Sequence, residues 1–414
     1  TNCLQGCSWR VQLSPREYQF TKEKKMSSSL FVGIDVSQKV NVVCAVDDRG
    51  QQVGKTACFA NNLPGAEQLN EWIFERMQAV QAEHLFVGTE ATSFYDFHLL
   101  EYLSQSQALA SYSTVLYRLN AKMVQKFKKA LYDQVKNDRK DAVAIAMRLR
   151  MRDLPVPFRA QLDHLPLQRL TRFRAHTAQT LAREKSYFLN HLFLKFSAYT
   201  QVKPFSNTFG VTSQALLAEN FSTDELMNIP VEELTDFLIQ KGKNRFADPK
   251  QIVEKIRQVA RESYCIRPSL AKSVNLVLSL SYKNIQTLTD TLKKVDQAIA
   301  KELTGFSTLL QTIPGIGPVY TAGIFAEIGN INYFPGHPQL AKYAGLAWSE
   351  YQSGEFLAQE TRMIKAANSY LRYYLIEAAN IVRQHDPVFK AFYQAKYEQT
   401  LKHKHKRALV LTAR

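Results

Sequence analysis

LFVGIDV, at residues 30–36, is a short apolar run, rich in β-branched residues, that predicts a buried strand. VNVVCAV (40–46) predicts a second strand, and the turn residues Asp48 and Gly50 lead into a third. The pattern then alternates, with helices expected at 65–80 and 93–107, strands at 84–91 and 111–117, and a basic helical stretch at 119–150. Three leading strands followed by alternating helices and strands predict an α/β domain over residues 28–155.

Acidic side chains stand at the ends of two predicted strands. Asp35 and Glu90 each follow a Val-Gly pair, in VGID and VGTE. Carboxylates at the ends of parallel neighbours can converge at one edge of a sheet. Asp138 and Asp141, in KNDRKDA, are three residues apart, which puts both on one face of a helix. We therefore expect four acids from three elements to form one site.

Such a group of carboxylates suits divalent cations. Four acids can hold two ions about 4 Å apart, the arrangement used for in-line phosphoryl displacement. Oxygen ligands favour Mg²⁺ or Mn²⁺. The alternative is structural: Asp35 and Glu90 as turn acids, with Asp138 and Asp141 balancing nearby lysines. Asp96, close to Glu90 in sequence, is interpreted as a helix-surface acid.

The charge of the chain is lopsided in sign. It carries 53 lysines and arginines against 37 aspartates and glutamates, a formal net charge of +16. Such a surplus favours phosphate backbones as partners, because each neutralised phosphate releases counterions. The stretch 119–150 is strongly basic, and its candidate nucleic-acid contacts are Lys122, Lys126, Lys128 and Lys129. Solvated lysines on an ordinary basic protein are the alternative.

Cysteine spacing and hydropathy bear on the class of protein. The five cysteines form no CxxC pair and no zinc spacing, which fits a reduced cytosol. No apolar run approaches the ~18 residues of a membrane span, so no membrane partner is expected. Residues 1–25 lack the apolar core of a signal peptide, and Met26 resembles a start residue, so we interpret the segment 1–27 as a leader or an added tail that precedes the first domain.

The rest of the chain predicts mainly helices. Long helical patterns at 165–200 and 284–304 suggest an antiparallel coiled coil within a segment 160–310, with a small helical insertion near 201–280. A third unit is expected over 311–400. The charge run LKHKHKR begins a solvated basic tail at 401–414.

A glycine-rich turn lies early in the third unit. In TIPGIGPVYTAGIFAEIG, Gly315 and Gly317 can let the backbone turn tightly between two helices, a helix-hairpin-helix pattern. The free N–H groups of the second helix can then bind a phosphate without reading base sequence. A glycine-rich connection that only permits close packing is an equal alternative.

A serine follows in LAKYAGLAWSEYQSGEF, where a loop or short hairpin is expected from Trp348 to Phe356. Ser353 stands before a glycine on that loop, and from its context alone such a serine is usually a turn residue. Three basic residues near the next helix can bind phosphates around a cleavage point: Arg362, Lys365 and Arg372. The nearby tyrosines Tyr370, Tyr373 and Tyr374 are candidates for a nucleophile, with helix packing preferred.

Taken together, VGIDVSQK, GTEAT, KNDRKDA, IPGIG, YAGL and SG resemble, in order and rough spacing, the DEDD-type transposases of insertion-sequence family one hundred and ten, relatives of the pilin-gene invertases. The resemblance spans about residues 28–385. It implies an RNase H-like (RuvC-like) domain whose metal ligands are Asp35, Glu90, Asp138 and Asp141. It also implies a mostly α C-terminal transposase domain in which Ser353 attacks DNA and forms a phosphoserine link.

The resemblance further implies partners. Family members use a structured non-coding (bridge) RNA that pairs with donor and target DNA, so that base pairing reads the sequence, as in RNA-guided nucleases. They assemble as homodimers and tetramers, with the carboxylates of one subunit facing the serine of another. A cytoplasmic bacterial protein, on the nucleoid when active, is expected.

Two other readings of the residues stay open. One is a RuvC-like, metal-dependent junction nuclease that uses water and forms no covalent intermediate. The other is a non-enzymatic nucleic-acid-binding protein that relies on the glycine-rich turn and the basic helices alone.

Overall fold

A computed structural model describes residues 28–414 except 92–93, 132–137, 152–153, 156, 159–161, 349–351, 354–355, 358–362 and 365–366, with the backbone alone at 352–353 and 356–357. The chain divides into two compact units, one ending at Ala160 and one beginning at Gln161. Each unit is described by itself below. Within the described residues, every helix is too short or too polar to span a lipid bilayer.

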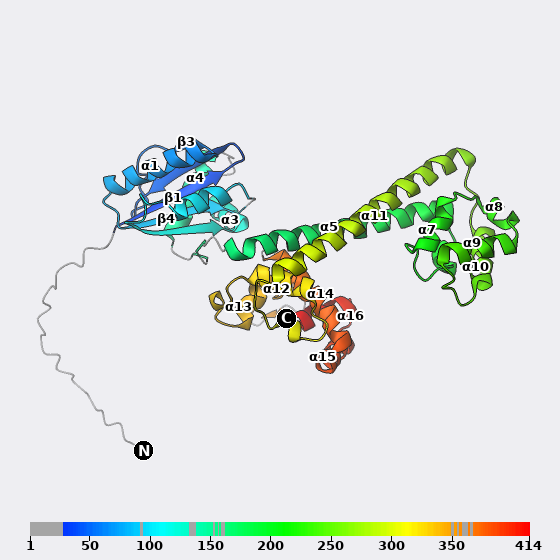
Figure 1. The fold of residues 1–414 in the computed structure, drawn as a ribbon. Helices are drawn as coiled ribbons and strands as arrows, with labels where there is room; N and C mark the ends of the chain where they lie inside the picture. Colours follow the sequence, from blue (N-terminus) through cyan, green and yellow to red (C-terminus); the bar gives the residue numbers. More distant parts are fainter. Residues whose placement is uncertain are drawn as a thin grey trace, which may run out of the picture. The chain divides into compact units, whose positions relative to one another are not determined.

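The first unit contains a five-stranded mixed sheet (Figure 1). Its strand order is β3 (Ala57–Ala60), β2 (Val40–Val46), β1 (Ser29–Val36), β4 (His84–Glu90) and β5 (Ser113–Leu119). β1 pairs antiparallel with β2 and parallel with β4, and β5 is parallel to β4. The predicted α/β architecture is therefore confirmed for this unit.

Helices cover both faces of this sheet. The described helices are α1 (Leu63–Ala79), α2 (Phe97–Ser104), α3 (Ala121–Leu131) and α4 (Asp138–Arg150). Because side chains alternate along a strand, Leu30, Val32 and Ile34 pack in a core with α1 and α2. Phe31 instead packs with the buried residues of α4. The odd-numbered residues of β1 thus face α4, which decides where Asp35 points.

Two predicted elements of this unit differ from those observed. The helix expected at 93–107 is α2, which spans only Phe97–Ser104 and is preceded by Asp96. The basic stretch expected as helical over 119–150 comprises α3 and α4 rather than one continuous helix.

Two long helices dominate the second unit, α5 (Leu165–Lys195) and α11 (Pro268–Leu303) (Figure 1). Leu167 packs against Val295, Ile299 and Leu303. At the other end of α5, Leu192 shares a core with Val274 and Leu278. The helices therefore pack antiparallel, as expected. However, α11 begins at Pro268 rather than near 284, since a proline is readily accepted in the first helical turn.

Five short helices join α5 to α11, within residues 199–262 rather than the 201–280 expected for the insertion. They are α6 (Tyr199–Val202), α7 (Val211–Ala218), α8 (Thr223–Asn228), α9 (Val231–Gly242) and α10 (Pro249–Glu262). Two hydrogen bonds link the entry and exit of the insertion: the Tyr264 amide donates to Ser197 Oγ (3.1 Å), and the Ala198 amide donates to Ser263 Oγ (3.2 Å). The insertion thus begins and ends at one narrow neck.

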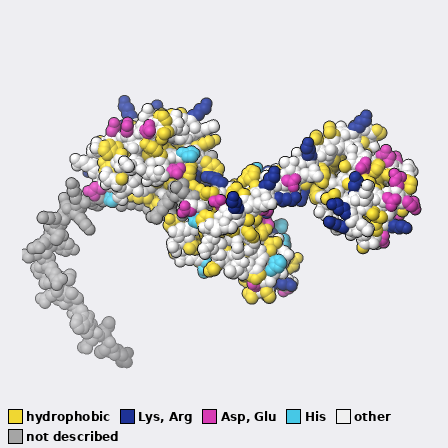
Figure 2. Space-filling view, in the orientation of Figure 1, with side chains coloured by type: hydrophobic (Ala, Val, Ile, Leu, Met, Phe, Trp, Pro, Cys, Tyr) yellow, Lys and Arg dark blue, Asp and Glu magenta, His cyan; other side chains and the backbone are white. Residues whose placement is uncertain are grey.

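The insertion differs in charge from the rest of the chain. Residues 199–267 contain nine lysines and arginines and nine aspartates and glutamates, so their formal charge is zero. Figure 2 shows acidic side chains gathered near α8 and α9. The whole +16 surplus therefore lies outside the insertion.

The remaining helices form the C-terminal part of the second unit. They are the 3-10 helices η2 (Leu310–Thr312) and η3 (Ile331–Tyr333), and the α-helices α12 (Pro318–Ile328), α13 (His337–Ala344), α14 (Ser369–His385), α15 (Pro387–Gln399) and α16 (Lys404–Ala413). Residues 401–407 are exposed, as expected of a charge run, but Leu409 and Val410 are buried. The end of the chain is a packed helix because Val410 faces the core that contains Tyr374 and Leu409 packs with Tyr393.

Candidate metal centre

Three of the four predicted acids meet at the edge of the sheet. Asp35 in β1 and Asp138 and Asp141 in the first turn of α4 each offer a carboxylate oxygen, and these oxygens lie within 4.8 Å of one another. Asp35 and Asp141 are half-buried and Asp138 is exposed. The three-residue spacing and the strand-end position therefore bring together the side chains that the sequence indicated.

The pleat of the strands explains why Asp35 and the α4 acids converge. Phe31 faces α4, and Gly33 and Asp35 follow it at two-residue intervals on the same face. On β4, Phe86 packs toward α4 and Gly88 contacts Leu149, so the alternation puts Glu90 on that face too. The two strand-end acids consequently share one face and one edge.

Close approach of α4 depends on the glycines that precede these acids. A Cβ at Gly33 would lie 2.2 Å from the Ala142 carbonyl oxygen and 2.3 Å from the Ala146 nitrogen. Gly88, paired with Gly33 in the ladder, leaves room only for the end of the Leu149 side chain, 2.9 Å from an added Cβ. The Val-Gly pairs noted in the sequence therefore serve the packing of the helix that carries Asp138 and Asp141.

Glu90 lies outside the group of three but interacts with it electrostatically. Burial raises the pKa of Glu90, the charge of Asp35 raises it further, and Lys128 lowers it. The repulsion from Asp35 shows that negative charge is concentrated at this edge. A divalent cation would relieve that repulsion, and the donors are all carboxylate oxygens, so the residues present fit Mg²⁺ or Mn²⁺.

Lys128 occupies a different place from the other lysines of α3. Its ammonium forms an ion pair with Asp141, and it also acts on Glu90. Lys122, Lys126 and Lys129 are exposed, as expected of candidate nucleic-acid contacts. Lys128 therefore lies beside the carboxylates in this structure, and its role as a nucleic-acid contact stays a prediction.

Asp96 is buried rather than on the helix surface, which corrects the sequence-based interpretation. Its side chain is 2% exposed and pairs with Arg118, whose Nε donates to Oδ2 (2.6 Å) and whose Nη2 donates to Oδ1 (2.9 Å). Thr89 Oγ1 donates to Oδ2 (2.9 Å). Because Thr89 and Arg118 face each other across β4 and β5, this network fastens the end of the strand beside Glu90.

The segment with the candidate serine forms the short hairpin that was expected. Ser353 lies in β6 (Gln352–Ser353), which pairs antiparallel with β7 (Phe356–Leu357), Ser353 opposite Phe356. The side chain of Ser353 lies outside the described part of the chain, as do Arg362 and Lys365. Arg372 Nη1 donates to the Ile364 carbonyl oxygen (3.3 Å), beside this segment.

The neighbouring tyrosines have packing roles, at least at Tyr374. This side chain is fully buried, and its hydroxyl donates to the Thr171 carbonyl oxygen at 2.5 Å. Burial raises the pKa of Tyr374 far above its ordinary value, and burial also raises that of Tyr373. The guanidinium carbon of Arg172 lies 4.9 Å from the centre of the Tyr370 ring. The preference for helix packing over a nucleophilic role is thus supported.

One glycine of the turn has a left-handed backbone conformation. Gly315 adopts a φ of +95°, which side chains rarely adopt, whereas Gly317 has an ordinary backbone and open space around it. α12 begins directly after Gly317 at Pro318. The element before the turn is the three-residue helix η2, not the longer helix expected there, so the predicted helix-hairpin-helix remains a hypothesis.

Comparisons with known proteins match two separate parts of the chain. A family model of DEDD transposases of the IS110 type matches residues 32–196, and a model described as the IS116/IS110/IS902 transposase family matches residues 307–394. The first match contains all four predicted acids, and the second contains Gly315, Gly317 and Ser353.

A curated relative and a solved structure also resemble the chain. An uncharacterized 44.8 kDa protein of insertion element IS116 from Streptomyces clavuligerus is 26% identical over 228 residues, 53% of this chain. The chain spans about half the length (54%) of that relative. The T. thermophilus RuvC protein, solved with a Holliday junction substrate, matches 32% of this chain and 99% of its own at 12% identity, with a TM-score of 0.24.

Proposed function

We propose that this chain, which belongs to the IS116/IS110/IS902 family of transposases, cuts and rejoins DNA at the carboxylate cluster of its N-terminal unit. The convergence of Asp35, Asp138 and Asp141 from two distant elements is the observation that carries this proposal. The RNase H-like fold that the family resemblance implies for the mixed sheet agrees with this proposal.

Each side chain of the centre has a distinct part in the proposal. Asp35, Asp138 and Asp141 would hold Mg²⁺ or Mn²⁺, with Glu90 as the fourth ligand. A bound cation of this kind stabilises the charge that develops on the phosphate oxygens. The exposed lysines of α3 would attract the DNA backbone toward the acids, and Lys128 partly neutralises those acids in the absence of DNA.

Ser353 is the proposed nucleophile. Its Oγ would attack a DNA phosphorus, the new O–P bond would replace the bond to a sugar oxygen, and the hydroxyl proton would end on that oxygen. The family match over residues 307–394, which include Ser353, and the place of Ser353 in β6 of the two-stranded hairpin support this assignment. The burial of Tyr374 removes one rival nucleophile.

Selectivity and assembly extend the same proposal. The family resemblance supports a structured guide RNA that pairs with donor and target DNA, and a dimer or tetramer that brings Ser353 of one subunit to the acids of another. The positive net charge of +16 is compatible with two kinds of nucleic acid at once.

Recombination of a plasmid that carries the gene with its native flanking DNA tests the proposal. We expect the wild type to give Mg²⁺-dependent strand cleavage and a covalent protein–DNA adduct on denaturing gels. Asp35→Asn and Asp141→Asn should abolish cleavage because each removes a ligand, whereas Glu71→Gln, an exposed acid on α1, should have no effect.

The outcomes separate the rival functions. If Ser353→Ala still cleaves DNA, a junction nuclease that uses water replaces the serine mechanism. If the wild type binds DNA but never cuts it with Mg²⁺, and Asp35→Asn binds equally well, the protein is a non-enzymatic binder. An RNA of discrete size that co-purifies without nuclease treatment would support the guide.

A further inference from the structure

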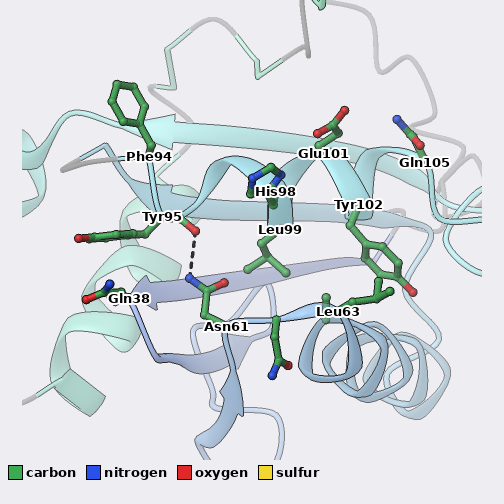
Figure 3. Close-up of a pocket in the computed structure, with 12 residues that line it drawn as sticks. Gln38, Asn61, Leu63, Phe94, Tyr95, His98, Leu99, Glu101, Tyr102 and Gln105 are labelled. Atoms are coloured by element: carbon green, nitrogen blue, oxygen red, sulfur yellow. Dashed lines mark hydrogen bonds between the residues drawn. The ribbon is translucent and has the colours of Figure 1, made fainter.

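A pocket of about 720 Å³ lies between α2 and the segment that joins β3 to α1. Figure 3 shows its lining, with Phe94, Tyr95, His98 and Tyr102 on one side and Asn61 and Leu63 on the other. The volume falls within the range typical of small-ligand sites.

The lining combines exposed rings with amide groups. Phe94 is 53% exposed, Tyr95 46% and Leu63 61%, an unusual group of large apolar side chains to leave in water. Gln38 and Gln105 add exposed carboxamides at its margins. Flat rings stack on flat ligands, and carboxamides both donate and accept hydrogen bonds, which is the chemistry of a nucleobase face and its edge.

The charge of the lining argues against a phosphate as the occupant. The lining residues that the structure describes include no lysine or arginine, and one of them is Glu101. The sugar–phosphate backbone would therefore be held elsewhere, while an uncharged base could enter. The formal net charge of the chain is +16, so this pocket, with a glutamate and no described lysine or arginine, differs in charge from the protein as a whole.

The segment that carries the two aromatic residues is held in place before any ligand arrives. Asn61 Nδ2 donates to the carbonyl oxygens of Ser37 (2.9 Å) and Tyr95 (3.0 Å), the second bond being the dashed line of Figure 3. Asn41 Nδ2 donates to Asn61 Oδ1 (3.3 Å). The Asn61 side chain thus connects the backbone that follows β1 to the backbone of Tyr95.

The pocket and the metal centre share one edge of the sheet. Gln38 follows the end of β1, which carries Asp35, and Tyr95 follows the end of β4, which finishes at Glu90. β1 and β4 are parallel, so both ends lie at the same edge. The acids face α4 and the pocket lies on the α1–α2 side of the sheet. A single strand of DNA that crosses this edge of the sheet would therefore reach both sites.

We infer that this pocket binds an unpaired base of the DNA strand that is cut, stacked on Tyr95 and Phe94. The inference rests on the proposed function, because the strand at the metal centre is then DNA rather than RNA. Holding one base outside the stack would fix the position of the neighbouring phosphate over the acids.

The test measures the affinity of the full-length protein for fluorescent oligonucleotides by anisotropy, in Ca²⁺ to suppress cleavage. Alanine at both Phe94 and Tyr95 should weaken binding of single-stranded DNA roughly tenfold or more, since each lost stack is worth about that factor. Tyr95→Phe should bind normally because it keeps the ring. Tyr264→Ala, which removes an 83% exposed ring from the insertion neck, is the matched control.

Two further measurements locate the base. Fully paired DNA should bind the double alanine variant and the wild type equally. Iododeoxyuridine in the single strand should photo-crosslink to Tyr95 or Phe94, identified by mass spectrometry.

Unchanged affinity in the double variant, a crosslink mapped elsewhere, or a requirement for RNA in place of DNA would overturn the pocket assignment while leaving DNA cleavage intact. A wild type that binds no DNA at all would overturn both the pocket and the proposed function.

Discussion

Lys195, near the end of α5, is a cation placed among apolar side chains. It is 4% exposed, and its ammonium has no hydrogen-bond partner among the described residues. Burial lowers the pKa of Lys195 from 10.5 to about 8, opposed in part by Glu225. Keeping this group charged at neutral pH therefore costs free energy of folding.

We expect Lys195→Met to stabilise the protein by about 2 kcal/mol at pH 7, because it removes the desolvated charge. Between pH 8 and 10.5 the unfolded lysine holds more protons than the folded one, so wild-type stability rises with pH in that window. The difference between variant and wild type should then vanish above pH 10.5. Denaturant unfolding at several pH values measures it.

Lys250→Met, which removes an exposed lysine, serves as the control and should change stability by less than about 0.5 kcal/mol at any of these pH values. A Lys195→Met protein that is less stable than the wild type at pH 7 would show that the ammonium has a favourable partner.

At the scale of the element, the distance between α4 and the sheet governs the metal centre. The acids Asp138 and Asp141 belong to α4, whereas Asp35 belongs to β1, so the cluster exists only while the helix stays close. Gly33 permits that approach, since any side chain there would meet the backbone of Ala142 and Ala146.

We expect Gly33→Ala to weaken Mn²⁺ binding at least tenfold and to destabilise the fold by about 1–3 kcal/mol, because α4 must move outward. Isothermal titration calorimetry and thermal melting measure the two effects. Gly88→Ala is the matched control and should do less, since it meets only the end of the Leu149 side chain. Equal Mn²⁺ affinity in wild type and Gly33→Ala would contradict the role of close packing.

The sequence predicted the local features of these elements better than their tertiary contacts. Strand-end acids and a D-x-x-D spacing follow from two-residue and helical periods, and three of the four acids do meet. The burial of Asp96 was missed because it depends on Thr89 and Arg118 facing each other across β4 and β5. These three polar residues are visible in the sequence, but only the register of β4 against β5 shows that they lie next to one another.

At the scale of the whole molecule, charge is distributed unevenly between parts. The insertion is neutral, while the exposed lysines of α3 belong to a strongly basic stretch. The packing of Leu409 and Val410 at the end of the chain was equally hidden from the sequence, since lysines and histidines just before them suggested a solvated tail. Total composition predicts a polyanionic partner but not which surface meets it.

We expect alanine at Lys126 and Lys129 to reduce the slope of log affinity against log salt for DNA by about 2, because each phosphate contact contributes about 0.9. Alanine at Lys241 and Lys243, equally exposed but on the neutral insertion, should leave the slope unchanged. Titrations at several salt concentrations measure both. A larger decrease of this slope in the insertion variant would place the DNA on the insertion and contradict the role of α3.

The neck of the insertion has a consequence for how such genes can change. Because Ser197 and Ala198 exchange hydrogen bonds with Ser263 and Tyr264, the polypeptide departs and returns at a single point. The residues between these two hydrogen bonds share a core with Leu192 of α5 and with Val274 and Leu278 of α11, so a segment of another length preserves the pairing of the long helices only if it still covers these side chains. Changes in the length of the insertion are therefore compatible with the rest of the second unit as long as these apolar helix ends stay buried.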